Sequence, residues 1–251
     1  MSVSIKTSRE IELMKVAGKY LEEVHERLAE HIKPGITTWE LDKIGEEMIR
    51  SLGCTPNFLN YNGFPASFCI SLNDEVVHGI PSHSKVIQEG DLVKIDAGLI
   101  YKGYHSDAAR TYAVGEVSPE ARQLMDVTKQ SFFEGIKQAK AGNHLYDISA
   151  AIGDYAESFG YGVVRDLVGH GIGTHLHEDP QIPNFRQHRR GLRLMPGMTL
   201  AIEPMINIGR ADVVFMDDDW TVVTQDGTLS AHYENTILIT DGEPELLTLS
   251  K

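Results

Sequence analysis

A stripe of apolar residues near the start of the chain predicts a long amphipathic helix. Its members recur three, four or seven positions apart and so share one helical face: Ile11, Met14, Leu21, Val24 and Leu28. Thr7 followed by Glu10 has the spacing of a capping box, so the helix is expected to begin after Thr7. Pro34 and Gly35 then interrupt the pattern and end the helix.

Three further helices are predicted from the residues at their ends. Thr37 and Glu40 form a second capping box, which opens a helix that reaches about residue 53. Ser118 followed by Pro119 is typical of an N-cap and a first helical residue, so a helix is expected from there to about residue 140. A fourth helix is expected over 145–159.

The segments between these helices are rich in apolar and β-branched residues and predict strands. They cover 67–72, 91–100, 104–114, 162–168, 198–208, 219–223 and 236–240. Two helices followed by a group of strands occur twice along the chain, which predicts an α+β fold of two similar halves packed around one sheet. No linker rich in Gly, Ser or Pro separates the halves, so residues 1–251 are expected to form a single domain.

Composition narrows the class of protein. With 41% hydrophobic and 24% charged residues, the chain is ordinary for a soluble globular protein. The formal net charge of −13 disfavours direct, sequence-independent binding to nucleic acid, which requires a basic surface. Cys54 and Cys69 are too few for a disulfide framework, and no signal-like or membrane-spanning apolar stretch stands out. A cytoplasmic protein is therefore expected, and a monomer, since no apolar patch in the sequence compels a dimer.

The first chemically informative stretch is a predicted β-hairpin, VKIDAGLIYKGYHSDAART, which turns near Lys102 and Gly103. A turn centred between these two residues places Asp96 opposite Ala109, one same-face step from Asp107. A turn centred one residue earlier places Asp96 directly opposite Asp107. Two ionised carboxylates this close in an apolar strand pair repel each other, which a bound cation would compensate. The alternative is that both aspartates face solvent.

The second stretch, LVGHGIGTHLHEDP, carries three histidines between glycines: His170, His175 and His177. A dinucleotide-binding loop is disfavoured, because the third glycine of that fingerprint is missing and no helical pattern follows. Isolated histidines are more often surface or core residues than ligands, and the sequence alone does not choose. Several in one loop punctuated by glycines favour ligation more than a single histidine would, without deciding it.

Two glutamates complete the set. Glu203 lies within the apolar run LAIEPMINIG, and Glu234 opens the apolar run of HYENTILIT. Each alone could be a surface residue at a strand end, but glutamates in such runs are rarely buried without a partner. Together with the residues above they make a set of four carboxylates and one imidazole: Asp96, Asp107, His170, Glu203 and Glu234. This set suits two divalent first-row metal ions better than it suits structural zinc.

The order and spacing of these five residues resemble the metal site of methionine aminopeptidases, within the pita-bread group of metallopeptidases. The resemblance covers essentially the whole chain and is closest to the short bacterial type I form. It extends to the flanking segments PGITTWELD, CISLNDEVVHGIP, EGDLVKIDAG, GHGIGTHLHEDP, MPGMTLAIEPM and YENT.

The resemblance implies a pita-bread fold: a curved antiparallel sheet with paired helices on its outer face and two halves related by a pseudo-two-fold axis. It also implies two metal ions on the concave face, with cobalt, manganese, iron and zinc all compatible with the ligands. Asp96 would bind one metal, His170 and Glu203 the other, and Asp107 and Glu234 both.

The implied activity is removal of the initiator methionine from nascent proteins. A metal-bridging hydroxide would attack the scissile carbonyl, and Glu203 would carry the proton of the attacking water to the leaving amine. His177 would stabilise the developing oxyanion, and His78 would contact the peptide nitrogen of the substrate.

The resemblance also maps a pocket for the methionine side chain onto Tyr61, Phe64, Cys69, His78 and Trp220. Aromatic rings and a thiol suit a polarizable thioether, although Phe64 and Cys69 taken singly fit an ordinary core equally well. The second residue of the substrate is expected to be small. Leu176 stands directly before His177, where some members have an aromatic residue. This difference affects the detailed shape of the pocket.

Two other functions compete with this one. Proline-specific peptidases share the five ligands but usually carry an additional N-terminal domain. A binding protein without activity on the same scaffold would have lost metal ligands, and all five are present. The expected partners are therefore nascent polypeptide N-termini, reached at the ribosome, with no membrane and no direct nucleic-acid contact.

Overall fold

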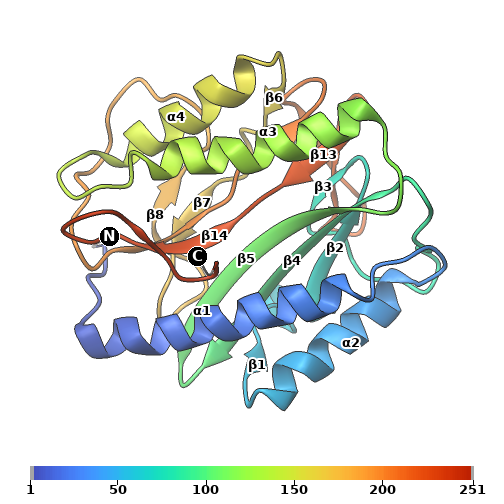
Figure 1. The fold of residues 1–251 in the computed structure, drawn as a ribbon, viewed down its shortest axis with the longest axis horizontal. Helices are drawn as coiled ribbons and strands as arrows, with labels where there is room; N and C mark the ends of the chain where they lie inside the picture. Colours follow the sequence, from blue (N-terminus) through green and yellow to red (C-terminus); the bar gives the residue numbers. More distant parts are fainter. Residues whose placement is uncertain (1–2, 250–251) are drawn as a thin grey trace.

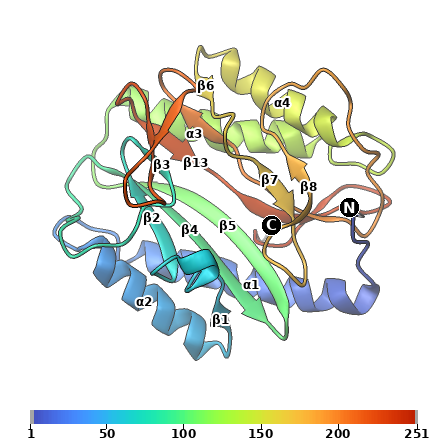
Figure 2. The same ribbon diagram turned by 180° about the vertical axis from the view of Figure 1, so that it is seen from behind.

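Two pairs of helices cover the strands of the protein. The structure is a computed structural model that describes residues 3–249. The pairs lie on the same side of the strands in both views (Figure 1 and Figure 2). They are α1 (Ser8–Ala29) with α2 (Thr38–Ser51), and α3 (Pro119–Ile136) with α4 (Leu145–Glu157).

The helix starts are where the sequence predicted them. Thr7 caps α1: its backbone N–H donates to the Glu10 carboxylate at 2.7 Å, and its hydroxyl accepts from the Glu10 N–H. Thr37 and Glu40 form the same capping box at α2. All four ends were predicted too far along the chain. The helices α1 and α2 stop at Ala29 and Ser51, before Pro34 and residue 53. The helices α3 and α4 stop at Ile136 and Glu157, rather than near residues 140 and 159. After α3 the chain continues in tight three-residue turns instead of helix.

The strands of the first half form one antiparallel sheet. Its members are β1 (Thr55–Pro56), β2 (Phe68–Leu72), β4 (Leu92–Tyr101) and β5 (Tyr104–Ala113). Both β1 and β2 pair with β4, which also forms the predicted hairpin with β5. Tyr101 pairs with Tyr104 and Asp96 with Ala109, so the first of the two possible hairpin registers is correct.

The second half contains more and shorter strands than the sequence suggested. The order β15–β14–β9–β7–β8 makes a five-stranded sheet, and β13–β10–β6 makes a three-stranded one. The strands β11 and β12 form another three-stranded sheet with β3, which comes from the first half. The single sheet expected from the sequence is therefore divided into four. The strands are β3 (Glu75–Val77), β6 (Gly162–Val163), β7 (Gly169–Gly171), β8 (Glu178–Ile182), β9 (Thr199–Ile202), β10 (Met205–Asn207), β11 (Val213–Phe215), β12 (Val222–Thr224), β13 (Ser230–His232), β14 (Asn235–Leu238) and β15 (Glu245–Leu246).

Three predicted strands differ from the observed ones. The run 198–208 is two strands, β9 and β10, because Pro204 has no N–H to continue the ladder and the chain changes sheets there. The run 162–168 contains only β6. The run 219–223 begins as a turn, with Asp219 at a φ of 65°, and becomes strand only at β12.

The two halves meet along β5 and β14, which lie side by side (Figure 1). The Glu234 N–H donates to the Ala109 carbonyl at 2.9 Å. Thr236 bonds both backbone groups of Asp107, accepting from its N–H at 3.1 Å and donating to its carbonyl at 2.9 Å. Each half has an apolar core of its own, and three further apolar clusters contain residues of both halves. The seam adds polar contacts to these apolar ones.

A buried histidine makes the first half sensitive to acid. His25 of α1 donates from Nε2 to the Ala108 carbonyl at 2.9 Å. Burial, reinforced by the positive charge of Arg110, lowers the pKa of His25 to about 3 from an ordinary value of 6.5. The unfolded chain therefore takes up a proton at this residue below pH 6.5 that the folded chain does not. This group alone lowers the free energy of unfolding by about 1.4 kcal/mol per pH unit as the pH drops from 6.5 toward 3.

His25→Gln keeps a donor for the Ala108 carbonyl but cannot take up the proton. We expect the variant to lose less stability between pH 7 and pH 5 than the parent does, by about 2 kcal/mol. Urea denaturation at both pH values measures this difference. The exposed His188, changed to Gln, is the matched control and should leave the pH dependence as in the parent. An unchanged slope in His25→Gln would contradict the assignment.

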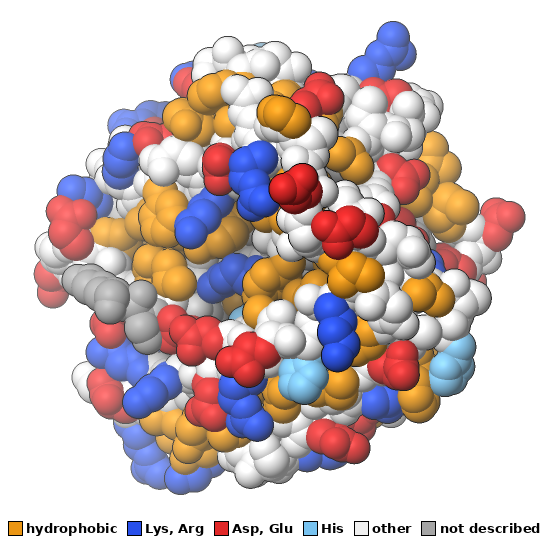
Figure 3. Space-filling view, turned by 45° about the vertical axis from the view of Figure 1, so that its right-hand side comes forward, with side chains coloured by type: hydrophobic (Ala, Val, Ile, Leu, Met, Phe, Trp, Pro, Cys, Tyr) orange, Lys and Arg blue, Asp and Glu red, His pale blue; other side chains and the backbone are white. Residues whose placement is uncertain are grey.

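The surface carries charges of both signs. On the face drawn in Figure 3, acidic and basic side chains are interspersed with apolar ones rather than gathered by sign. Within residues 3–249, no helix combines the length and apolar character needed to cross a membrane.

Candidate metal centre

The β4–β5 hairpin places two aspartates on one face. Asp96 pairs with Ala109, and Asp107 lies two residues before Ala109 on the same strand. Because side chains alternate across a strand, Asp96 and Asp107 point to the same side of the sheet. That side is buried, with Asp107 4% exposed. The alternative that both aspartates face solvent is therefore wrong.

Two glutamates from the second half face each other in the same way. Ile202 of β9 pairs with Asn235 of β14, and Met205 of β10 pairs with His232 of β13. The same register continued across the gap sets Glu203 opposite Glu234. Both strands change sheets at this point, so the regular ladder is interrupted where the two carboxylates lie.

His170 lies in a strand rather than in the loop that its flanking glycines suggested. It is the central residue of β7, paired with Ala201 of β9 on one side and Gln181 of β8 on the other. Its Nδ1 donates to the Gly171 carbonyl at 2.8 Å, which leaves the lone pair on Nε2. Glycine is required at residue 171, because a Cβ there would lie 2.2 Å from the Asp179 carbonyl oxygen.

The Nε2 atom of His170 faces the carboxylates, 3.7 Å from Asp107 Oδ2 and 3.6 Å from Glu203 Oε1. Burial lowers the pKa of His170 to about 3, so the ring is neutral at physiological pH. One ligand atom each from Asp107, His170 and Glu234 lie within 4.8 Å of one another. A neutral imidazole and carboxylates at this separation are the donors expected around a divalent metal ion.

The carboxylates lack the partners that buried charges need. Burial raises the pKa of Asp96 to about 7. Burial together with negative neighbours raises the pKa values of Asp107, Glu203 and Glu234 well above the ordinary range. In the described part of the chain, Asp96 Oδ1, Asp107 Oδ1 and Glu234 Oε1 accept no hydrogen bond. Divalent cations fit this donor set, because they supply the missing positive charge and use the orphaned oxygens.

The five residues line a cavity of about 200 Å³ together with every other residue predicted to be catalytic or to bind the substrate. Of the described residues that line it, none is Lys or Arg. Its walls are made by Phe58, Tyr61, Asn62, Phe64, Cys69, His78, Leu176, His177 and Trp220.

His177 lies at the mouth of this cavity. Its Nδ1 is 2.7 Å from the Tyr61 hydroxyl, and its ring packs edge-on against His170 with 4.3 Å between the centroids. Partial burial lowers the pKa of His177, so the ring is neutral. The third histidine of the motif, His175, is exposed and lines a neighbouring groove instead.

His78 is held in an unusual conformation. Its φ of 59° lies in the left-handed region, which residues other than glycine seldom adopt and which is found most often at functional sites. Burial lowers the pKa of His78 to about 4. The ring meets Trp220 edge-on at 6.4 Å, and Trp220 in turn meets Phe64 edge-on at 5.1 Å. These rings and Cys69, which is 5% exposed, form the apolar end of the cavity.

Phe58 and Asn62 line the cavity but were missed in the sequence. Asn62 lies in the short 3-10 helix η1 (Tyr61–Gly63), and Asn60 and Asn62 have φ values of 66° and 49°. The segment NYNGF contained the signal, since Asn and Gly favour positive φ and mark a tight turn. That turn is what brings Tyr61 to His177.

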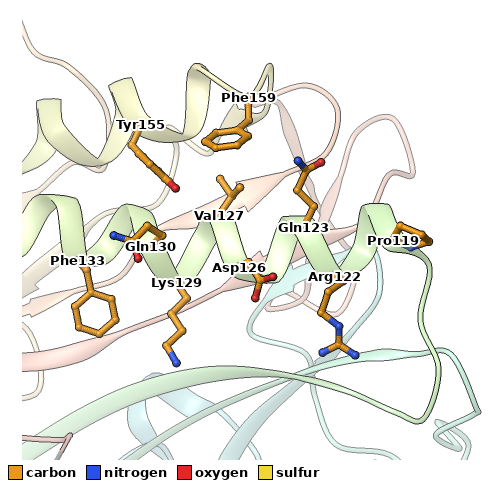
Figure 4. Close-up of a pocket in the computed structure, with 10 residues that line it drawn as sticks. All are labelled: Pro119, Arg122, Gln123, Asp126, Val127, Lys129, Gln130, Phe133, Tyr155 and Phe159. Carbon is orange, nitrogen blue, oxygen red and sulfur yellow. The ribbon is translucent and has the colours of Figure 1, made fainter. Parts of the chain in front are cut away.

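A broader groove of about 710 Å³ lies on the outer surface of α3 and α4 (Figure 4). Asp126 is the single carboxylate among its lining residues, beside Arg122 and Lys129, and the described lining has no histidine. It therefore lacks the donors that metal chemistry needs, although it is larger than the cavity with the carboxylates.

The model of one protein family, metallopeptidase family M24, matches residues 12–241. The chain belongs to metallopeptidase family M24. Its M24 relatives include the methionine aminopeptidase of Clostridium acetobutylicum, 54% identical over 98% of this chain and 99% of that protein. Methionine aminopeptidase 1 of Bacillus subtilis is 49% identical over 97% of this chain and 98% of its own length. The protein is thus a metal-dependent peptidase that is similar to bacterial methionine aminopeptidases over almost its entire length.

Solved M24 structures agree with this placement. Methionine aminopeptidase from Thermotoga maritima superposes with a TM-score of 0.97 at 45% identity, over 99% of this chain and 100% of that one. The Xaa-Pro dipeptidase of Bacillus anthracis has a TM-score of 0.81 at 29% identity, and this chain covers 62% of it. The pita-bread fold expected from the resemblance is confirmed, and the proline-specific relative is a longer protein.

Proposed function

We propose that the protein removes the N-terminal methionine from nascent proteins whose second residue is small. The observation that carries the proposal is the composition of one cavity: four carboxylates and a neutral histidine at one end, aromatic rings and a thiol at the other. The relatives that are similar over their full length are named methionine aminopeptidases, which supports this choice among metallopeptidase activities.

Two divalent metal ions, drawn from manganese, iron, cobalt and zinc, would be held at the polar end. Asp96 would serve one ion, His170 and Glu203 the other, with Asp107 and Glu234 shared between them. Four carboxylates balance the charge of two divalent ions. Bound there, the ions would supply Lewis-acid activation of the scissile carbonyl and of water.

The protein's own groups then handle the proton and the developing charge. Glu203 takes the proton released as water adds to the scissile carbonyl and delivers it to the nitrogen of the leaving amine. With the Tyr61 hydroxyl, 2.7 Å away, as the donor to His177 Nδ1, the proton of His177 lies on Nε2. From there it can be donated to the carbonyl oxygen as that oxygen becomes negative. His78 contacts the peptide nitrogen of the substrate.

The apolar end selects the methionine side chain. Tyr61, Phe64, Cys69, His78 and Trp220 would surround it, and a thioether packs well against aromatic edges and sulfur. The cavity of about 200 Å³ has room for one such side chain beside the metal site. The preference for a small second residue is taken from the family resemblance. Leu176, buried at 2% exposure, completes the wall where some members have an aromatic ring.

Peptide hydrolysis tests this function directly. Metal-stripped protein is resupplied with manganese or cobalt and given a peptide that begins Met-Gly, with Met-Leu and Ala-Pro peptides as comparisons. Release of free methionine from Met-Gly alone, and only with metal, is the expected result. Cleavage before proline would move the protein to the proline-specific branch of the family. No release from any peptide by protein with metal bound would instead favour a binding protein.

We propose that the protein meets nascent chains in the cytoplasm, as they leave the ribosome. Both cysteines are free, which suits a reducing compartment. We propose that the protein acts there as a monomer, and sedimentation at working concentration distinguishes a monomer from a dimer.

A further inference from the structure

The segment that precedes α1 crosses over the loop that carries His177. Lys6 in this segment is 7% exposed, and its Nζ lies 2.6 Å from Glu178 Oε2. The same Nζ contacts the Ser4 hydroxyl, and the Lys6 N–H donates to the Gly197 carbonyl at 2.8 Å. Lys6 is therefore fixed at its backbone and at the end of its side chain.

Glu178 ties this lysine to the loop itself. Its carboxylate accepts from the His175 N–H at 3.2 Å, so one side chain bonds both Lys6 and the loop backbone. Glu178 directly follows His177 and pairs with Gly171 at the start of β8. Any shift of the Glu178 side chain thus acts on the segment that carries His177.

Gly173 leaves the space in which Lys6 lies. A Cβ at residue 173 would lie 2.3 Å from Lys6 Cε and 2.7 Å from Glu178 Oε1. The other side of the loop is held by His105, whose N–H donates to the Gly173 carbonyl at 2.8 Å. The loop is consequently held between His105, near the start of β5, and Lys6.

This ion pair differs from those on the surface. The side chains of Lys6 and Glu178 are 4% and 13% exposed, whereas Lys15 and Glu245 form a comparable pair at 35% and 44% exposure. Exposed pairs contribute little because water and ions screen them. Removing one partner of a buried pair leaves the other charge without compensation, so the local structure must change.

We propose that Lys6 is a positioning residue for catalysis: its ion pair with Glu178 holds the loop so that His177 stays against Tyr61 and His170. The part that concerns catalysis rests on the function proposed for His177. Lys6 is not among the residues that line the cavity, so it contacts neither the carboxylates nor the apolar end. Its effect should therefore be confined to turnover, with metal affinity and KM left as in the parent.

Lys6→Met tests the proposal, because methionine keeps the length of the side chain and removes its charge. We expect kcat on a Met-Gly peptide to fall about tenfold, as misplacement of a catalytic group does, with KM and metal affinity within about twofold. Lys15→Met, which breaks the exposed pair, is the matched control and should keep the parent's kcat. If Lys6→Met is too unstable to purify, Lys6→Met/Glu178→Gln removes both charges and should show the same fall.

A second arm asks whether the effect passes through His177. In a His177→Ala background, Lys6→Met should cause no further fall in kcat. An equal tenfold fall in both backgrounds would overturn the proposal, because Lys6 would then act on another part of the site.

Hydrogen exchange measured by mass spectrometry provides a readout that needs no activity. Lys6→Met should speed exchange in peptides that contain residues 173–178 while exchange in β4 and β5 stays as in the parent. Unchanged exchange in that loop would overturn the proposal even if kcat fell. Should the parent release no methionine at all, the proposed function would fail, and the exchange arm would still decide whether Lys6 holds the loop.

Discussion

Asp107→Asn should lower the affinity for divalent metal by more than about 100-fold. Losing a residue that merely hydrogen-bonds to a metal ligand already lowers metal affinity by about 10- to 100-fold. In metal-free protein the same change should be stabilising. Burial and the charges of Asp96 and Glu203 raise the pKa of Asp107 well above its ordinary value, so its carboxylate destabilises the fold when ionised. An asparagine amide has no charge and can donate to the neighbouring carboxylates. One substitution thus moves metal binding and metal-free stability in opposite directions.

Calorimetric titration with manganese measures the first effect, and thermal unfolding in chelator measures the second. We expect the unfolding midpoint of the metal-free variant to rise by about 2–4 °C for each kcal/mol gained. The midpoint rise that the parent shows on adding metal should disappear in Asp107→Asn. Asp126→Asn, in the outer groove of Figure 4, is the control and should change neither quantity. Parent-like metal affinity in Asp107→Asn would show that this carboxylate is not a ligand.

His177→Ala should lower kcat by about 10²–10³-fold, the usual cost of losing a donor to a developing oxyanion. Metal content should stay at the parent's level, because His177 is not among the proposed ligands. Its Nδ1 bonds the Tyr61 hydroxyl, and its ring packs against the His170 ring with 4.3 Å between the centroids. Tyr61→Phe removes only the partner of Nδ1 and should cost about tenfold, the equivalent of one hydrogen bond. Steady-state kinetics with a Met-Gly peptide and metal analysis after dialysis give both quantities.

His170→Ala provides the contrast. It should retain less metal after dialysis than the parent, because the Nε2 lone pair facing Asp107 and Glu203 is lost. Unchanged turnover in His177→Ala would remove the role assigned to that residue. Equal metal retention in His170→Ala and the parent would count against ligation by His170.

Local signals in the sequence were enough to predict the helices. Thr7 with Glu10 and Thr37 with Glu40 are capping boxes whose bonds form between residues three apart, so each helix start is specified within one turn of chain. The short strands have no such signal. β7 is Gly-His-Gly and is a strand only because β8 and β9 pair with it, which the sequence of β7 itself does not contain.

The site was predictable to different degrees for its two pairs of carboxylates. Asp96 and Asp107 belong to one hairpin, so the turn at Lys102 determines their spacing. Glu203 and Glu234 come from strands far apart in the sequence, and their opposition depends on a long-range register that no local pattern reveals. The sequence singled them out as glutamates within apolar runs, but it did not show that they face each other, which the register of the strands explains.

The seam between β5 and β14 divides the proposed metal ligands by chain position. Asp96 and Asp107 come before the connection between β5 and α3, and His170, Glu203 and Glu234 come after it. If the chain is cut after the exposed Glu116, each fragment keeps its own helix pair and apolar core but only part of the donor set. Turnover would then require the fragments to reassociate through the Asp107–Thr236 contacts and through the apolar clusters that contain residues of both halves. The fold could therefore serve as a split reporter, in which proteins fused to the two fragments are read out by released methionine.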